Sequence, residues 1–445
     1  MKKRSLTHIL GIYLLLMIVI PKSFNSLFGI IPVRLVLSGL FVLINLINKI
    51  KNKAFNLSGK KYIVLGIIFL LTTIPSFFVT KNIYSSLYTF LKFSIAFMVF
   101  EVVYNSKLKK EDIKLLFRYL CISLVVVLIY ALIQYIFRFN LFTIGAYNYP
   151  GARGRVSSTF FNTIYFAIFL NIVISLLSFY ISRLNNNKLK ALYTVFLIVS
   201  YTCLLLTFTR SAIMIFIGCL LVTLIINHKV LVNKLLLPTY IVMISASLFI
   251  PGVKSLYVKT YEDIRFLVSD KLLVMFLPGL DEKEITKSDK IIDYTDDASL
   301  NSRIEFSKIG NKLGKDHMFT GIGFGAYEDY VYSKEYVTNY PNFANYRVFP
   351  HSTLVLLYAE VSVLSIVAFI AIVALLVFDL IKLWLKNKKT EIRGLSALAL
   401  TIIAGFMVVN IVAENAVYDS QIFPIFLIVI GSIFSYINEV KLCQK

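Results

Sequence analysis

Long apolar stretches alternate with short polar segments along almost the whole chain. The apolar stretches run for roughly 15–25 residues, which is the length needed to cross the hydrocarbon core of a bilayer. The pattern therefore predicts an all-α polytopic membrane protein with about 12 transmembrane helices. The predicted spans are 7–21, 29–48, 62–80, 83–104, 115–137, 159–182, 191–208, 211–227, 235–250, 352–381, 394–412 and 421–437.

Composition supports this reading. Hydrophobic residues make up 58% of the 445 residues and charged ones 16%, whereas soluble domains average about 45–50% and about 25%. The basic start Met1–Arg4 leads into apolar Ile9–Ile20 with no small-residue cleavage site, so we expect the first span to be retained. A disulfide framework or zinc site is not indicated, because three of the four cysteines lie in predicted spans. They are Cys121, Cys203, Cys219 and Cys443.

The location of the positive charge sets the expected orientation. The net charge is +22, and 25 of the 46 Lys and Arg residues fall in alternate segments between the spans, with none of these segments skipped. Basic residues concentrate on the cytoplasmic side of membrane proteins. We therefore expect both termini in the cytoplasm, an interaction with the lipid bilayer and none with nucleic acid. The chain divides into helices 1–9 (1–250), a large extracytoplasmic loop (251–350) and helices 10–12 (351–445).

The loop 251–350 is the one stretch with the composition of a soluble segment. It holds 15 of the 24 acidic residues and 13 Lys and Arg. Near its end, Ser302–Lys315 places Ile304, Ile309 and Leu313 at helical spacing, which predicts an amphipathic helix. The glycine-rich run Phe319–Tyr327 follows. It lacks the preceding strand and the following Lys-Ser/Thr of a nucleotide-binding loop, so by itself it indicates a flexible turn.

Arginines mark three places on the predicted outer face. Arg153 and Arg155 lie in Gly151–Ser158 before the sixth span, and they could equally be interfacial arginines that reach the headgroups. Arg210 lies in an otherwise uncharged hairpin, where an unpaired charge is costly and a functional role is the default expectation. Arg303 begins the amphipathic stretch.

A histidine marks the fourth place. His351 enters the tenth span, and it is the one histidine expected at an outer membrane surface beside a helix start. A lone histidine is more often structural, but three arginine sites nearby favour a base or ligand, since its pKa suits proton transfer near neutral pH. Glu360 lies about 180° around the same predicted helix, which fits a buried pairing or packing role better than shared catalysis.

Arg34, Lys92 and Glu414 are predicted intramembrane charges with no assigned partner, and the acidic group Asp293, Asp296 and Asp297 is read as solvated rather than metal-binding.

Three of these motifs together resemble the O-antigen polymerase and ligase superfamily, over roughly residues 150–370. They are Thr209–Ser211, the helix from Arg303 to the glycine run Thr320–Gly325, and His351-Ser followed by Leu-x-x-x-Ala-Glu at Leu356–Glu360. The resemblance implies a GT-C-like membrane fold. It also implies an inverting, metal-independent glycosyltransferase that uses an undecaprenyl-diphosphate-linked oligosaccharide as donor and needs no cofactor.

The same resemblance suggests roles for individual residues. Arg210 and Arg303 would hold the diphosphate, and His351 would orient or deprotonate the attacking sugar hydroxyl. The residues expected to bind substrate are Arg155, Arg153, Gly323, Gly325 and Tyr327. Arginines fixed at the membrane surface can stabilise the negative charge that builds on a leaving diphosphate.

Two serines favour a polymerase over a ligase within this superfamily. Ser362 and Ser365 stand where members of the ligase branch carry glycine. We therefore expect a polymerase in the bacterial cytoplasmic membrane that makes a capsule, O-antigen or exopolysaccharide, with a chain-length regulator and a flippase as further partners. A ligase is the alternative on the same fold. A flippase is the alternative of another class, which the large outer loop and the absence of an internal repeat disfavour.

Overall fold

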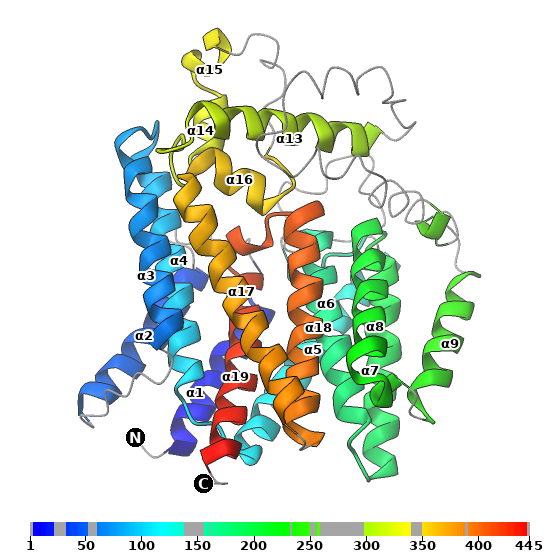
Figure 1. Cartoon of the computed structure of the whole chain (residues 1–445). Helices are drawn as coiled ribbons and strands as arrows, with labels where there is room; N and C mark the ends of the chain where they lie inside the picture. The colour runs from blue at the N-terminus through cyan, green and yellow to red at the C-terminus, as the bar shows by residue number, and fades with distance from the viewer. Residues whose placement is uncertain are drawn as a thin grey trace.

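The computed structural model consists of helices joined by turns throughout its described residues. These are residues 3–21, 33–51, 60–137, 155–160, 162–231, 234–249, 253, 256–258, 298–339, 349–387 and 390–442. The described part contains no β-strand, which confirms the all-α prediction. Figure 1 shows a bundle of long helices beneath a layer of shorter ones.

A helix occurs at each of the twelve predicted spans. The bundle helices before the large loop are α1 (Lys3–Val19), α2 (Val33–Lys51), α3 (Lys60–Thr73) with the 3-10 turn η2 (Ile74–Phe78), α4 (Ile83–Tyr104), α5 (Lys110–Phe137), α6 (Thr163–Ile181), α7 (Asn187–Leu206), α8 (Arg210–Leu231) and α9 (Leu236–Ser247). Those after it are α17 (Val363–Lys386), α18 (Thr390–Val412), η5 (Ala416–Tyr418) and α19 (Ile422–Leu442). Within the described residues, nine helices are long and apolar enough to cross a membrane, and α1, α2 and α9 contain shorter apolar segments.

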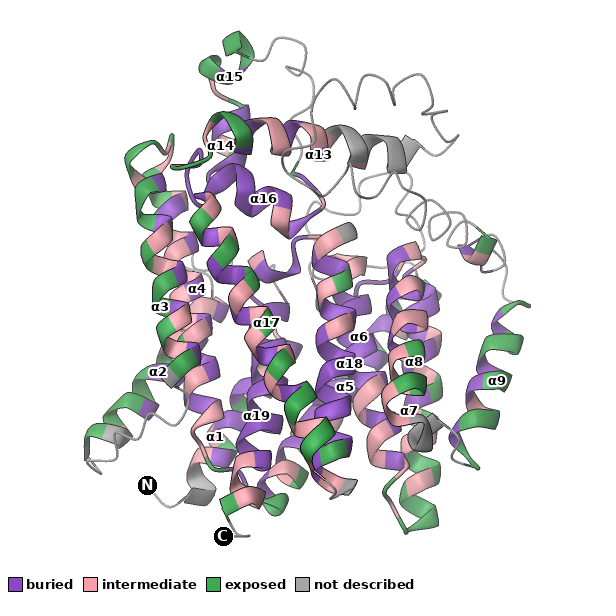
Figure 2. Cartoon of the chain, viewed as in Figure 1, coloured by how far each residue is buried: buried purple, intermediate pink, exposed green. Residues whose placement is uncertain are grey.

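The centre of the bundle is formed by α6, α18 and α19, whose residues are mostly buried (Figure 2). Alpha helices suit this environment because they satisfy every backbone polar group internally, which hydrocarbon cannot do. Helix α18 packs against α8, α17 and α6, while α19 packs against α4. The outer helices α2, α3 and α17 keep exposed apolar faces, such as Leu364 and Val367 on α17, which is expected of surfaces in contact with lipid.

The tenth predicted span is wrong as a single helix. Residues 352–381 form two helices, α16 (Thr353–Glu360) and α17, and the chain is extended at Val361 and Ser362 between them. The break is held by backbone pairing with the glycine run. Ile322 N–H donates to the carbonyl of Ala359 (3.0 Å) and Gly323 N–H to that of Glu360 (3.1 Å). These bonds replace the helical ones that would have continued α16 into α17.

The short helices form an outer layer with a hydrophobic core of its own. The layer consists of α13 (Ala298–Asp316), α14 (Tyr327–Val331), α15 (Lys334–Asn339) and α16. Helix α13 confirms the predicted amphipathic helix, since Ile309 and Leu313 are buried. They pack with Ile322, Tyr327, Tyr330, Val331, Tyr336, Leu356 and Ala359. Both ends of the chain lie at the opposite end of the bundle (Figure 1).

Candidate active site

His351 lies in the outer layer, two residues before α16 begins. Its Nδ1 is buried without a hydrogen-bond partner, although 27% of the side chain remains exposed. The Phe306 ring of α13 lies 6.1 Å from the imidazole, centroid to centroid. Burial and the nearby positive charge of Arg303 lower the pKa of His351 to about 4. The imidazole is therefore neutral at physiological pH and able to accept a proton.

Helix α13 brings Arg303 to the histidine because two glycines let it pack closely on α16. A Cβ at Gly310 would lie 2.5 Å from Val355 Cγ1, and one at Gly314 would lie 2.3 Å from Tyr358 Cδ1. Glycines four residues apart present one flat helix face to a neighbour. Arg303 precedes Gly310 by seven residues, which is close to two full turns, so it extends from the same face. The structure thus brings together two of the three predicted catalytic residues.

Arg210, the third, is the first residue of α8 and is partly buried. Helix α8 runs away from the outer layer, whereas its neighbour α18 runs towards that layer and ends just before Glu414. Arg210 therefore lies at the same end of the bundle as His351 and Arg303 (Figure 1).

Arg155 binds the turn from which Arg210 begins α8. Its Nε donates to the carbonyl of Thr207 (2.9 Å), and one terminal nitrogen donates to the carbonyl of Phe208 and to Thr209 Oγ1 (both 3.0 Å). Phe208 has φ +46°, which is unusual for a residue with a side chain. A guanidinium with this fork of bonds fixes the conformation of the turn. Arg153 lies outside the described residues.

Glu360 organises the glycine run from inside the protein. Its carboxylate is fully buried and accepts bonds from Gly325 N–H (2.9 Å), Tyr327 N–H (3.2 Å) and the Tyr418 hydroxyl (2.7 Å). Lys92 of α4 donates to the carbonyl of Tyr418 (2.6 Å). Glu360 therefore has a buried pairing and packing role, in which its carboxylate joins the glycine run to the segment after α18.

The three substrate-binding candidates in the glycine run are packed against other parts of the protein. Gly323 (φ +122°) and Gly325 (φ +77°) leave no room for a Cβ, which would lie 2.4 Å from Thr80 Oγ1 and 2.0 Å from Thr89 Oγ1 respectively. Tyr327 is fully buried and stacks on Phe349. Their positions indicate a close backbone approach between the outer layer and α4, rather than a cradle for phosphate.

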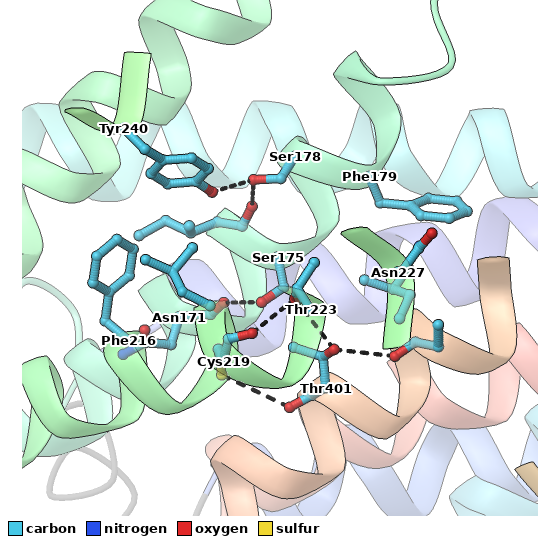
Figure 3. Close-up of a pocket in the computed structure, with 14 residues that line it drawn as sticks. Asn171, Ser175, Ser178, Phe179, Phe216, Cys219, Thr223, Asn227, Tyr240 and Thr401 are labelled. Carbon is cyan, nitrogen blue, oxygen red and sulfur yellow. Dashed lines mark hydrogen bonds between the residues drawn. The ribbon is translucent and has the colours of Figure 1, made fainter. Parts of the chain in front are cut away.

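A small cavity of about 30 Å³ lies between α6, α8 and α18. Asn171, Ser178, Cys219, Thr223 and Thr401 are among its lining residues, and Tyr240 donates or accepts a bond with Ser178 across it (Figure 3). Its volume would hold about two water molecules. Phe216 is the α8 lining residue nearest to Arg210 and lies six residues further along the helix, or about 9 Å deeper in the bundle. Arg210, Arg303 and His351 are not among the lining residues, so this cavity is not part of the candidate site.

The remaining predicted intramembrane charges have partners in the structure. Arg34 is fully buried and donates to the carbonyls of Ile20 and Thr159. Glu414 follows α18, and its Oε2 lies 3.9 Å from Nδ1 of His351. Among the described residues, no group of three or more His, Cys, Asp or Glu side chains is placed to hold a metal ion. The acidic group at 293–297 lies outside those residues.

The middle of the chain matches the O-antigen ligase family model, from residue 193 to residue 361. Residues 193–361 thus resemble an O-antigen ligase domain. This confirms the resemblance to the O-antigen polymerase and ligase superfamily, and it supports a polymerase or ligase type of role in polysaccharide assembly. The domain contains Arg210, Arg303, His351 and Glu360, whereas Arg155 and Glu414 lie outside it. The chain has no match among the curated proteins compared with it.

Two features of the site were not predicted from sequence. The sequence assigns no partner to Glu414, which lies 63 residues from His351 with no periodicity linking the two positions. Arg155 was expected to bind substrate, and its bonds to the turn before α8 were not predicted. They go mostly to main-chain carbonyls, which every residue has, so no residue type in the sequence indicates them. The one indication in the sequence that Glu414 has a role is its position as a charged residue after a long apolar stretch.

Proposed function

We propose that this protein is a polysaccharide polymerase of the cytoplasmic membrane. It would join undecaprenyl-diphosphate-linked oligosaccharide units at the outer face, in an inverting reaction that needs no metal ion. The O-antigen ligase family domain supports the reaction type, and the helical membrane bundle with its outer layer is compatible with a GT-C-like fold. The observation that carries the proposal is the approach of Arg303 to a partly buried, neutral His351 inside that matched stretch.

The reaction is a displacement at the anomeric carbon of the donor sugar. The acceptor hydroxyl oxygen forms a bond to that carbon from the face opposite the diphosphate, and the carbon–oxygen bond to the diphosphate breaks. Its electron pair leaves with the diphosphate, where negative charge develops. Arg303 and Arg210 would bind that charge, as fixed cations do when they stabilise a transition state.

His351 would take the proton that the acceptor hydroxyl loses. The imidazole can accept it because burial and Arg303 keep the ring neutral before substrate binds. Once the diphosphate is bound, its negative charge offsets that of Arg303, and the imidazole becomes a stronger base. Donor binding would thus prepare the base for the acceptor.

A ligase on the same fold is the second candidate, favoured by the description of the matching family. The two serines that depart from the ligase pattern are ordinary packing residues in the structure. Ser362 Oγ donates to the carbonyl of Thr72 (3.0 Å) and lies 3.1 Å from Ser365 Oγ, and neither serine has positive φ. Cells that lack a ligase accumulate long lipid-linked polymer, whereas cells that lack a polymerase accumulate single repeat units.

The test replaces His351 and Arg303 separately with alanine in cells that lack the native copy. We expect His351→Ala and Arg303→Ala each to abolish polymer on a gel of cell-surface glycan and to leave single repeat units. His317→Ala is the matched control, since His317 lies at the far end of α13, 3.4 Å from the Tyr330 hydroxyl. Protein amount in the membrane is measured for each variant. Near-normal chain lengths in both alanine variants would refute the assignment.

A further inference from the structure

Glu414 and His351 come from distant parts of the sequence and meet in the outer layer. The distance between Glu414 Oε2 and His351 Nδ1 is 3.9 Å, and the Glu414 side chain is 16% exposed. Nδ1 is the buried nitrogen of the ring and has no hydrogen-bond partner. The exposed part of the imidazole is therefore elsewhere on the ring, which leaves Nε2 as the nitrogen available to a substrate.

The backbone around both residues is tied together. Asn415 Nδ2 donates to the carbonyl of Pro350 (2.7 Å), directly before His351. Thr353 donates to Asn410 Oδ1 (2.8 Å), which also accepts the N–H of Val417 (2.9 Å). These bonds fix the segment after α18 against the start of α16, so the approach of Glu414 to His351 is built into the fold.

The proposed chemistry needs a carboxylate in this position. In the described part of the chain, the charged groups that face His351 are Arg303 from α13 and Glu414 from the segment after α18. Arg303 serves the leaving diphosphate but weakens the histidine as a base. A carboxylate that accepts from Nδ1–H selects the tautomer with a free Nε2 and stabilises the imidazolium after proton transfer.

We propose that Glu414 is a positioning residue for His351, accepting a hydrogen bond from Nδ1–H so that Nε2 takes the acceptor's proton. The inference rests on the proposed function of His351. At 3.9 Å the contact is longer than a hydrogen bond. Contacts of this kind are often long in the unliganded state and shorten in the substrate complex.

The direct test measures the protonation of His351 in the full-length protein in lipid nanodiscs. Protein labelled with ¹⁵N-histidine is titrated between pH 3.5 and 8 by NMR, and His351→Ala identifies the signal. We expect the wild-type midpoint well below the usual imidazole value of about 6.5, because burial and the charge of Arg303 lower the pKa of His351 to about 4. Glu414→Gln should lower the midpoint by about one unit or more, as loss of an opposite charge at this distance does. Glu414→Asp should restore most of it.

The second measurement is polymer length in cells. Glu414→Gln should reduce polymer at least about ten-fold, within the range that a positioned base contributes, and Glu414→Asp should recover it. Glu328→Gln is the control, since Glu328 is an exposed carboxylate on α14 in the same outer layer. A purely structural role would lower the protein amount without moving the His351 midpoint.

The outcomes separate the two proposals. A midpoint unchanged by Glu414→Gln, or normal polymer in that variant, would overturn the role of Glu414. If His351→Ala still makes polymer, the proposed function itself fails, whatever Glu414 does. Where Glu414→Gln does not fold, the ¹⁵N shifts of wild-type His351 decide the question, because a neutral ring that carries its proton on Nε2 instead of Nδ1 would overturn the role of Glu414.

Discussion

At the scale of single residues, Arg155 binds the turn from which Arg210 begins α8. Its guanidinium spans the carbonyls of Thr207 and Phe208 and the hydroxyl of Thr209, directly before Arg210. Thr209 also bonds to Thr163 at the start of α6 (3.2 Å). The sequence alone identifies Arg155 and Arg210 as unusual, but it does not assign them different roles. An arginine that binds substrate and one that fixes a turn look the same in a sequence, because both are charges in a short segment between apolar spans.

A charge-preserving substitution distinguishes these two roles of Arg155. Arg155→Lys keeps the positive charge but cannot reproduce the planar fork of bonds. We expect both Arg155→Lys and Arg155→Ala to reduce polymer by about ten-fold or more, since each hydrogen bond to a charged group contributes about 1.5–3 kcal/mol. Arg118→Ala, at an exposed arginine on α5, serves as the control. Full activity of Arg155→Lys would mean that charge alone matters, as in direct diphosphate binding.

At the scale of elements, the break between α16 and α17 was the main feature that sequence did not predict. Hydropathy continues across Val361 and Ser362, and neither proline nor glycine interrupts the run. The helix ends there because Ile322 and Gly323, some forty residues earlier, bond to its last carbonyls. Such tertiary pairing leaves no local mark. The amphipathic α13, in contrast, was predictable because its buried residues follow the helical period.

The glycine face of α13 gives a prediction at this scale. Gly310→Leu or Gly314→Leu should push α13 away from Val355 and Tyr358 and destabilise the outer layer by about 1–3 kcal/mol, as overpacking does. Burial is the larger cause of the low pKa of His351 and Arg303 the smaller one, so movement of Arg303 away from the imidazole should raise this pKa only part of the way from about 4 towards 6.5. NMR titration and polymer length measure the two effects.

The control for the glycine face is Gly218→Ala on α8, where a Cβ would meet no atom within 4 Å. This variant should keep normal polymer and an unchanged His351 titration. Wild-type behaviour of both leucine variants would show that α13 does not depend on these glycines to place Arg303.

At the scale of the whole molecule, sequence was most informative, because bilayer thickness and charge asymmetry constrain the entire chain at once. Helices occur at all twelve predicted spans, although the tenth is divided into α16 and α17, and nine helices of the described part are long enough to cross a membrane. The chain ends lie opposite the outer layer (Figure 1), as an even number of crossings requires. The end of the bundle that faces the cytoplasm is predicted only from the distribution of Lys and Arg among the segments between the spans.

Labelling of single cysteines tests that orientation. We expect a membrane-impermeant maleimide to label Glu328→Cys on α14 in intact cells, and Lys188→Cys at the start of α7 only after permeabilisation, since both positions are exposed and lie at opposite ends of the bundle. Both variants carry Cys443→Ser, and labelling is compared with the same chain lacking the new cysteine. The reverse pattern would place His351 and the arginines in the cytoplasm. A transfer reaction on the outer face would then be impossible, whatever the chemistry of the site, so this result would refute the proposed function at the level of the whole molecule.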